Sequence, residues 1–388
     1  MSSQTRAEQG RTVWAESTPR LRILHCIPGF GGGGAERQLT YLVPGLQKNG
    51  VDVHIAFHLE GPNLPRIQDS GATLHKLRSL GNHDPLILWQ LISTVRAIKP
   101  DLIQTWLTQM DILGGVAAYV TQTPFLLMEQ ASGLGYTGTW KDGLRCLIGQ
   151  RAAVIVANSN AGKEYWRSRK RPDLIRVIRN AVPMEEIRQT VPSCINTYGI
   201  QETSEVLLFA GRYSSQKNVL TLLDAILRVL SDRVTATAVF FGAGPLESEL
   251  VARARSYAMD GRIRILPYTN ELWSWMKRAS LFVSPSIFEG SPNAIYEAAA
   301  LKCPLVLSNI PEHRELLSDD SAFFVDPDSP LDIARGIHEG LQDPERAKRK
   351  AESANVRLSH FTIDLITSQY LALYKAVLEG SELMPCLE

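Results

Sequence analysis

Short apolar runs alternate along most of the chain with longer segments whose apolar residues recur at helical spacing. In the first half, runs typical of buried strands lie at 21–27, 52–59, 73–77, 102–106, 125–129, 154–157 and 175–178. The alternation restarts with runs at 205–210, 235–241, 262–266, 281–284, 304–307 and 322–325. Strands that alternate with helices in this way predict parallel sheets covered by helices, which is the α/β fold class.

The pattern breaks between residues 183 and 204, where proline, glycine and polar residues replace the apolar runs. This break predicts a linker between two doubly wound, Rossmann-like domains at 21–182 and 205–362. Residues 1–20 are polar and predict a disordered tail. The final segment, 363–388, is predicted to contain a last helix that ends near residue 378.

The composition excludes several classes of protein. A net charge of +1 gives no reason to expect nucleic acid as a partner. No apolar run approaches the roughly 20 residues that span a bilayer, and the first 20 residues lack an apolar signal core. The 5 cysteines are scattered without metal or disulfide spacing, as in a reducing compartment. We therefore expect a cytoplasmic protein.

The stretch 288–300, FEGSPNAIYEAAA, follows a buried strand and predicts a turn that opens a helix. Ser291 is the predicted N-cap and Pro292 the first helical residue. A helix N-terminus carries unpaired N–H groups and partial positive charge, which suit a phosphate. Glu289 precedes this start and Glu297 lies about 12 Å farther along the axis. Two carboxylates so placed suit a nucleotide sugar, although two solvated glutamates are the alternative.

Two more loops carry candidate chemistry. Gly29, Gly31 and Gly34 formally match the dinucleotide pattern G-x-G-x-x-G after the first strand, yet no acidic residue closes the second strand to hold a ribose. A tight strand-to-helix turn is the structural alternative. Arg212 and Lys217 lie five residues apart in a loop after a strand, where both cations can point at a diphosphate or remain surface charges.

The stretch 288–300 resembles the E-x7-E motif of retaining glycosyltransferases with the GT-B fold, most closely those of glycosyltransferase family 4. The resemblance extends, motif by motif, from about residue 21 to residue 379. It implies two Rossmann-like domains that face a central cleft, with the acceptor on the N-terminal domain and a UDP- or GDP-sugar on the C-terminal one. It also implies that segment 363–388 packs back on the N-terminal domain.

The same resemblance implies a retaining transfer without a metal or other cofactor, to a glycan, lipid-linked or small-molecule acceptor, in bacterial polysaccharide or glycoconjugate biosynthesis. It assigns the donor-sugar hydroxyls to Glu289, the diphosphate to Arg212 and Lys217, and the ribose to Glu297. The other donor-binding positions that it implies are Gly31, Gly32, Gly33, Gly242, Gly244, Tyr268, Gly290, Ser291, Pro292, Asn293 and Ala294.

One departure concerns the acceptor side. Many family members carry a histidine after the fourth strand, where this chain reads TWLTQMD at 105–111. We expect Trp106, Gln109 and Asp111, together with Glu129 at the end of the fifth strand, to line the acceptor side.

Three alternatives remain open. Asp326 and Asp328 formally match a D-x-D metal motif, but the proline between them favours an ordinary turn before a helix. The basic run 167–171 is either a solvated loop or a weak contact for anionic lipid at the inner face of a membrane. The rival functions are a sugar-nucleotide epimerase or phosphorylase on the same fold, and a nucleotide-sugar-binding protein without catalysis.

Overall fold

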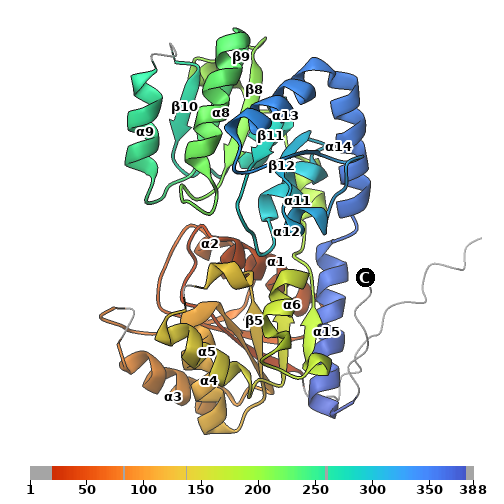
Figure 1. Cartoon of the computed structure of the whole chain (residues 1–388). Coiled ribbons are helices and arrows are strands. Elements are labelled where there is room, and N and C mark those ends of the chain that lie inside the picture. Colours follow the sequence, from red (N-terminus) through yellow and green to blue (C-terminus); the bar gives the residue numbers. More distant parts are fainter. Residues whose placement is uncertain (1–19, 82–83, 137, 258–260, 382–388) are drawn as a thin grey trace, which may run out of the picture.

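The computed structural model describes residues 20–81, 84–136, 138–257 and 261–381, which form two α/β domains placed end to end (Figure 1). The predicted tail, 1–20, lies outside the described residues except for Arg20. Both domains contain one parallel sheet with helices on its two faces. None of the helices in the described part of the chain combines the length and apolar character that a membrane span requires.

The first domain contains a seven-stranded parallel sheet in the order β3-β2-β1-β4-β5-β6-β7. Its strands are β1 (Arg22–Cys26), β2 (Asp52–Phe57), β3 (Thr73–Lys76), β4 (Leu102–Trp106), β5 (Phe125–Glu129), β6 (Val154–Ala157) and β7 (Ile175–Val177). Its helices are α1 (Gly34–Lys48), α2 (Leu64–Gln68), α3 (Leu86–Ile98), α4 (Leu107–Thr121), α5 (Trp140–Gly149) and α6 (Asn160–Arg167), with 3-10 turns at Gly133–Gly135 and Pro172–Leu174.

The second domain contains a six-stranded parallel sheet in the order β10-β9-β8-β11-β12-β13. Its strands are β8 (Glu205–Ala210), β9 (Ala236–Phe241), β10 (Ile263–Leu266), β11 (Leu281–Ser284), β12 (Leu305–Ser308) and β13 (Phe323–Val325). Its helices are α7 (Met184–Arg188), α8 (Val219–Asp232), α9 (Glu247–Ser256), α10 (Leu272–Arg278), α11 (Asn293–Ala300), α12 (Pro311–Arg314), α13 (Pro330–Gln342) and α14 (Pro344–Leu358).

Every predicted strand is present, and each end lies within two residues of its prediction. The central strands β4, β5 and β11 are buried along their whole length, because helices cover both sheet faces. In each domain the apolar side chains form two cores, one on either face of the sheet. This two-faced burial explains why the strands read as continuous apolar runs rather than as alternating ones.

The segment 183–204, the predicted linker, packs against the second domain. It contains α7 and a 3-10 turn at Ile195–Tyr198. Met184, Ile187, Ile195 and Ile200 are buried in the core that also holds α11. Met184 and Ile187 lie three residues apart on α7, whereas Ile195 and Ile200 follow no regular period. The linker at 183–204 stays a prediction, and its apolar residues are packed against the second domain.

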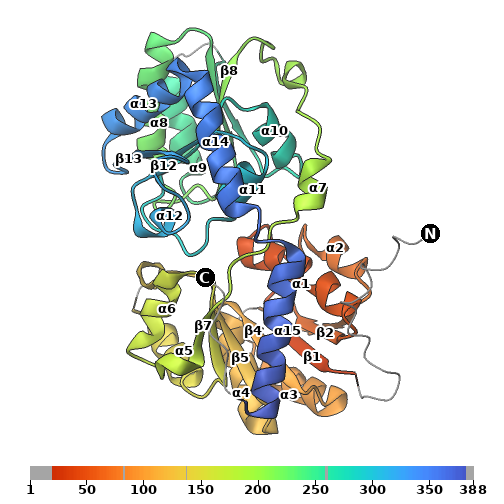
Figure 2. The same ribbon diagram turned by 90° about the vertical axis from the view of Figure 1, so that its right-hand side faces the viewer.

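The chain passes between the domains at two adjacent points. Val182 leads from the first domain into α7, and its N–H donates to the carbonyl of Phe361 at 2.8 Å. Phe361 precedes the last helix, α15 (Ile363–Glu379), which returns to the first domain and runs beside α1 (Figure 2). Tyr370, Leu373 and other residues of α15 are buried in the core of the first domain.

Candidate active site

The loops that follow the carboxyl ends of the strands meet at the interface between the two domains. The first domain contributes the β1–α1 loop and the loop after β5, and the second contributes the β8–α8 loop and the turn between β11 and α11. Contact is close here, since a Cβ added to Gly290 would lie 2.2 Å from the carbonyl oxygen of Gln130. A Cβ on Gly34 would lie 2.5 Å from Asn293 Nδ2. The sequence stretch 288–300 therefore lies directly against the first domain.

Helix α11 begins one residue later than predicted. Pro292, with φ −81° and ψ 85°, is the N-cap, and the helix starts at Asn293 with no side-chain cap. The predictions of Ser291 as the cap and Pro292 as a helical residue are therefore wrong, because the backbone of Pro292 is not helical. Asn293 instead accepts hydrogen bonds through Oδ1 from Gln38 at 3.2 Å and from Asn180 at 2.6 Å. The start of α11 is thus tied to the first domain.

Glu289 and Lys217 form a mostly buried ion pair in the second domain. The carboxylate oxygen Oε1 of Glu289 lies 2.6 Å from Lys217 Nζ, and their side chains are 5% and 22% exposed. Burial favours the neutral acid, but the Lys217 ammonium and nearby hydrogen bonds outweigh it and hold the pKa of Glu289 below its usual value. Glu289 is therefore an anion beside a partly accessible cation.

Sequence reasoning missed His313, which lies next to this pair and is fully buried. The Ser308 hydroxyl donates its hydrogen to the carbonyl of Ser286 at 2.6 Å, so it has none left to donate to His313. Nδ1 of His313 therefore carries a hydrogen, which it donates to the carbonyl of Ser308 at 3.0 Å. Burial lowers the pKa of His313 to about 4, although Glu289 opposes this change. A neutral imidazole therefore lies near the Glu289 carboxylate. A lone histidine with no motif around it gave no signal in the sequence.

Glu297 is held from the opposite domain. Its Oε1 lies 2.6 Å from Nη1 of Arg37 on α1, and its side chain is 3% exposed. The negative charge of Glu297 raises the pKa of Arg37 and keeps the guanidinium charged. Arg37 Nη2 also lies 3.4 Å from the hydroxyl of Tyr268, which is half-exposed after β10. Arg37 was not predicted, because its partner lies 260 residues away in the sequence.

The glycines of the site are backbone spacers. A Cβ on Gly242 would lie 2.0 Å from the carbonyl oxygen of Gly211, and one on Gly244 would lie 2.4 Å from that of Tyr213. The loops after β8 and β9 can therefore touch only because these side chains are absent. Gly32 lies against the Tyr268 ring, 3.5 Å from an added Cβ, and the neighbouring predicted positions, Gly31 and Gly33, adjoin Glu36.

Arg212 is exposed just after β8, and its charge acts on Glu36 of α1 in the other domain. Burial raises the pKa of Glu36 on α1, and the positive charge of Arg212 works against this rise. The two predicted clamp cations therefore differ in their partners. Lys217 pairs with Glu289 of its own domain, whereas the charge of Arg212 acts on Glu36 of the other domain.

Three of the four predicted acceptor-side residues are buried in the described structure. Trp106, Asp111 and Glu129 are at most 1% exposed. Arg145 binds both acids, with Nε 2.7 Å from Asp111 Oδ2 and Nη1 2.8 Å from Glu129 Oε2. Both carboxylates are therefore occupied by Arg145 in the described structure, and the assignment of these three residues to the acceptor side stays a prediction. Gln109 is half-buried and lies 3.1 Å from His58 Nε2, so it remains a candidate.

Glu129 instead positions the loop that follows β5. Its Oε1 accepts hydrogen bonds from the backbone N–H of Ala131 at 2.9 Å and from the Tyr136 hydroxyl at 2.6 Å. This loop includes Gln130, which touches Gly290 beside Glu289. The buried pair of Glu129 and Arg145 therefore helps to position a loop of the domain interface.

The two secondary motifs have local explanations. Asp326 Oδ1 accepts a hydrogen bond from the N–H of Asp328 at 3.0 Å, as in an ordinary turn, and the described residues contain no acid, histidine or cysteine group suited to a metal. In the basic run 167–171, Arg167 and Arg171 form ion pairs with Glu164 and Asp173.

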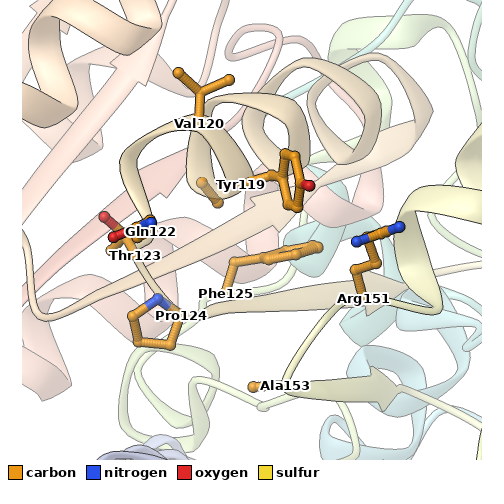
Figure 3. A pocket seen from close by; sticks show the side chains of 9 residues that line it. Tyr119, Val120, Gln122, Thr123, Pro124, Phe125, Arg151 and Ala153 are labelled. Atoms are coloured by element: carbon orange, nitrogen blue, oxygen red, sulfur yellow. The ribbon is translucent and has the colours of Figure 1, made fainter.

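A surface pocket of about 680 Å³ lies at the amino end of β5, where Phe125 and Arg151 point toward one another (Figure 3). The pocket is lined by Ala118, Tyr119, Val120, Gln122, Thr123, Pro124, Phe125, Arg151 and Ala153. The pocket lies at the amino ends of the strands, whereas the interface loops follow their carboxyl ends. None of the described residues that line it is an acid, a histidine or a cysteine. We therefore place the candidate site at the domain interface.

Comparisons with known proteins identify the family of the chain. Two family models match the chain in succession, Glycosyltransferase Family 4 over residues 32–186 and Glycosyl transferases group 1 over residues 194–357. An uncharacterised glycosyltransferase of Methanocaldococcus jannaschii is 23% identical over 340 residues, which cover 80% of this chain and 86% of that protein.

A second relative has a specific name. The N-acetylgalactosamine-N,N'-diacetylbacillosaminyl-diphospho-undecaprenol 4-alpha-N-acetylgalactosaminyltransferase of Campylobacter jejuni is 25% identical over 219 residues. The match covers 55% of this chain and 58% of that protein, which is less than two thirds of the relative's length.

The fold is shared with a solved structure, that of HepE from Anabaena in complex with UDP and glucose. The TM-score is 0.82 at 19% identity, over 92% of this chain and 100% of the HepE chain. The two successive family models and this shared GT-B fold show that the chain belongs to the glycosyltransferases of family 4, group 1.

Proposed function

We propose that the protein is a retaining, metal-independent glycosyltransferase that moves a sugar from a UDP-sugar to a lipid-linked or glycan acceptor in polysaccharide or glycoconjugate biosynthesis. The observation that carries this proposal is the pair of buried carboxylates on either side of the start of α11, Glu289 bound to Lys217 and Glu297 bound to Arg37. The UDP and glucose of the HepE complex support the donor class, and the diphospho-undecaprenol in the name of the Campylobacter relative supports a lipid-linked acceptor.

In this reaction the bond between the anomeric carbon and the diphosphate oxygen breaks, and the diphosphate leaves with the electron pair. The acceptor oxygen forms the new bond to the same carbon, and its proton passes to the oxygen of the departing diphosphate. Negative charge grows on the diphosphate, where Lys217, Arg212 and the uncapped start of α11 supply positive charge. Positive charge grows on the sugar ring, which the Glu289 carboxylate stabilises.

Metal independence follows from the same cations. Two side-chain charges and a helix N-terminus can neutralise a diphosphate without a divalent ion. We therefore expect turnover to persist in EDTA. A rate that collapses on chelation and returns with Mg²⁺ or Mn²⁺ contradicts this part of the proposal and makes Asp326 and Asp328 candidates again.

The donor is tested first by thermal shift with UDP, GDP, ADP and their glucose conjugates. We expect the uridine compounds to stabilise the protein most, while a GDP preference changes only the base.

Turnover is then measured with polyprenyl-diphosphate sugars and free glycans as acceptors, and NMR of the product determines whether the donor's anomeric configuration is retained. Binding without turnover on the whole panel supports a non-catalytic protein. Epimerised nucleotide sugar, or a reaction that needs inorganic phosphate, supports the epimerase or phosphorylase.

A lipid-linked acceptor places the protein at the inner face of a membrane, so we propose a cytoplasmic protein with peripheral contact. The basic run 167–171 is the candidate for that contact, through Arg169 and Lys170, which form no ion pair with an acid in the described residues. Sedimentation with anionic vesicles at low salt tests this contact.

A further inference from the structure

Only one of the two carboxylate oxygens of Glu297 has a hydrogen-bond partner in the described structure. Oε1 pairs with Arg37, whereas Oε2 is buried and has no hydrogen-bond partner among the described residues. A carboxylate oxygen can accept two hydrogen bonds, and leaving a buried one unpaired costs free energy. The donor that Oε2 lacks is therefore expected to come from a bound molecule.

The partner that holds Glu297 belongs to the other domain. Arg37 lies on α1 and its side chain is 16% exposed, and its second nitrogen, Nη2, approaches the hydroxyl of Tyr268. Tyr41, one turn farther along α1, is also buried, and its hydroxyl has no hydrogen-bond partner in the part of the chain that the structure describes. First-domain side chains therefore form one wall around a carboxylate that the second domain provides.

We propose that Arg37 is a positioning residue for the nucleotide donor, because it holds Glu297 by one oxygen and presents the other to a ribose hydroxyl. The donor site of the second domain is then complete only when the first domain lies against it. This inference rests on the proposed function and adds to it a residue of the opposite domain. The competing possibility is a latch, in which Arg37 occupies Glu297 and must leave before the ribose binds.

The chain provides a matched control for the loss of an interdomain ion pair. Arg179, just after β7, pairs with Glu315, just after α12, and these side chains are 19% and 13% exposed. Arg179→Met thus removes a comparable contact between the domains without touching Glu297. Arg37→Met removes the contact that holds Glu297.

The experiment measures the affinities of UDP, 2′-deoxy-UDP and 3′-deoxy-UDP by isothermal titration calorimetry on the full chain. In the wild type and in R179M, we expect UDP to bind about tenfold or more tightly than at least one deoxy analogue, as for a charge-assisted hydrogen bond. In R37M this ratio should fall toward one, as it should in Glu297→Gln.

An R37M variant that keeps the wild-type ratio overturns the inference. So does one that binds UDP more tightly than the wild type, since that result identifies a latch. An equal loss of the ratio in R179M overturns it as well, because the cause is then loosened domains rather than a misplaced carboxylate. A folded wild type that binds neither UDP nor GDP contradicts the proposed function itself, and with it this inference.

Discussion

At the scale of single residues, the three charged side chains near α11 are predicted to act at different steps. Under the proposed function Lys217 would contact the diphosphate, whose charge grows as the bond breaks, so Lys217→Met should lower kcat by about 10- to 100-fold, which corresponds to about 1.5–3 kcal/mol. Glu297 would hold the ribose equally before and during reaction, so Glu297→Gln should mainly raise the donor's KM. Glu289→Gln should reduce kcat and weaken discrimination between donor sugars.

Steady-state kinetics on folded variants provide the measurement, with Lys348→Met as the control because this lysine is exposed on α14. Near-wild-type constants for all three variants would remove the glutamate motif from the active site.

The buried acid Asp111 makes stability depend on pH. Burial raises its pKa from 3.8 to about 6, although Arg145 and the Thr105 hydroxyl oppose the rise. The folded protein thus keeps a proton that the unfolded chain releases near pH 4. This contribution to stability is complete below about pH 4 and is lost as pH rises through about 6, up to about 3 kcal/mol at 1.36 kcal/mol per pKa unit.

The isosteric variant Asp111→Asn removes this titration. Its amide can accept from Arg145 and donate to Thr105, whose hydroxyl can turn to the carbonyl of Leu126, 3.3 Å away. Relative to the wild type, its free energy of unfolding should therefore rise between pH 4 and pH 6. Denaturant titrations at several pH values test this, with Asp173→Asn as control. The hydrogen bond from Arg171 lowers the pKa of Asp173, so the control should show no trend in that window. The prediction is contradicted if the difference in free energy of unfolding between Asp111→Asn and the wild type does not change with pH.

At the scale of helices and strands, the sequence predicts best what is decided locally. The strands need only a short apolar run, and all thirteen lie within two residues of their predicted ends. The predicted start of α11 differs from the observed one by one residue, because proline suits both the N-cap and the first helical turn. The pairing of Asp111 and Glu129 with Arg145 could not be predicted, because Arg145 comes from another helix. No local sequence pattern predicts such a contact. The ion pair between Arg37 and Glu297 could not be predicted for the same reason.

The contact between α1 and α15 gives an element-scale prediction. A Cβ on Gly45 in α1 would lie 2.2 Å from Oγ1 of Thr367 in α15, and 3.2 Å from its Cβ. Gly45→Ala should therefore destabilise the protein, since overpacking costs about 1–3 kcal/mol and alanine recovers only about 1 kcal/mol of helix propensity. With Thr367→Ala already present, Gly45→Ala should be neutral or stabilising.

A double-mutant cycle by chemical denaturation measures the coupling between these two sites. If Gly45→Ala changes the free energy of unfolding equally in both backgrounds, the two sites are not coupled, and the prediction of a tight contact between α1 and α15 at this point is contradicted.

At the scale of the whole molecule, sequence order and spatial domain do not coincide. The chain crosses between the domains at Val182 and again after Phe361, and α15 ends the sequence while its buried residues belong to the core of the first domain. Ion pairs from Arg37 to Glu297 and from Arg179 to Glu315 join the same two bodies. The first domain therefore depends on residues synthesised after the second domain is complete.

Two leucines of α15 test this dependence with the same chemical change. Leu373 is buried in the core of the first domain at 6% exposure, whereas Leu378, on the same helix, is 40% exposed. Leu373→Ala should cost about 2–5 kcal/mol by leaving a cavity, whereas Leu378→Ala should cost far less. Within the described residues, no α15 side chain belongs to either core of the second domain. Hydrogen exchange in Leu373→Ala should therefore accelerate in β1 and β4 but not in β8 and β11. Equal acceleration in both sheets would show instead that the two domains unfold as one unit, with α15 stabilising the whole chain rather than the domain on which it lies.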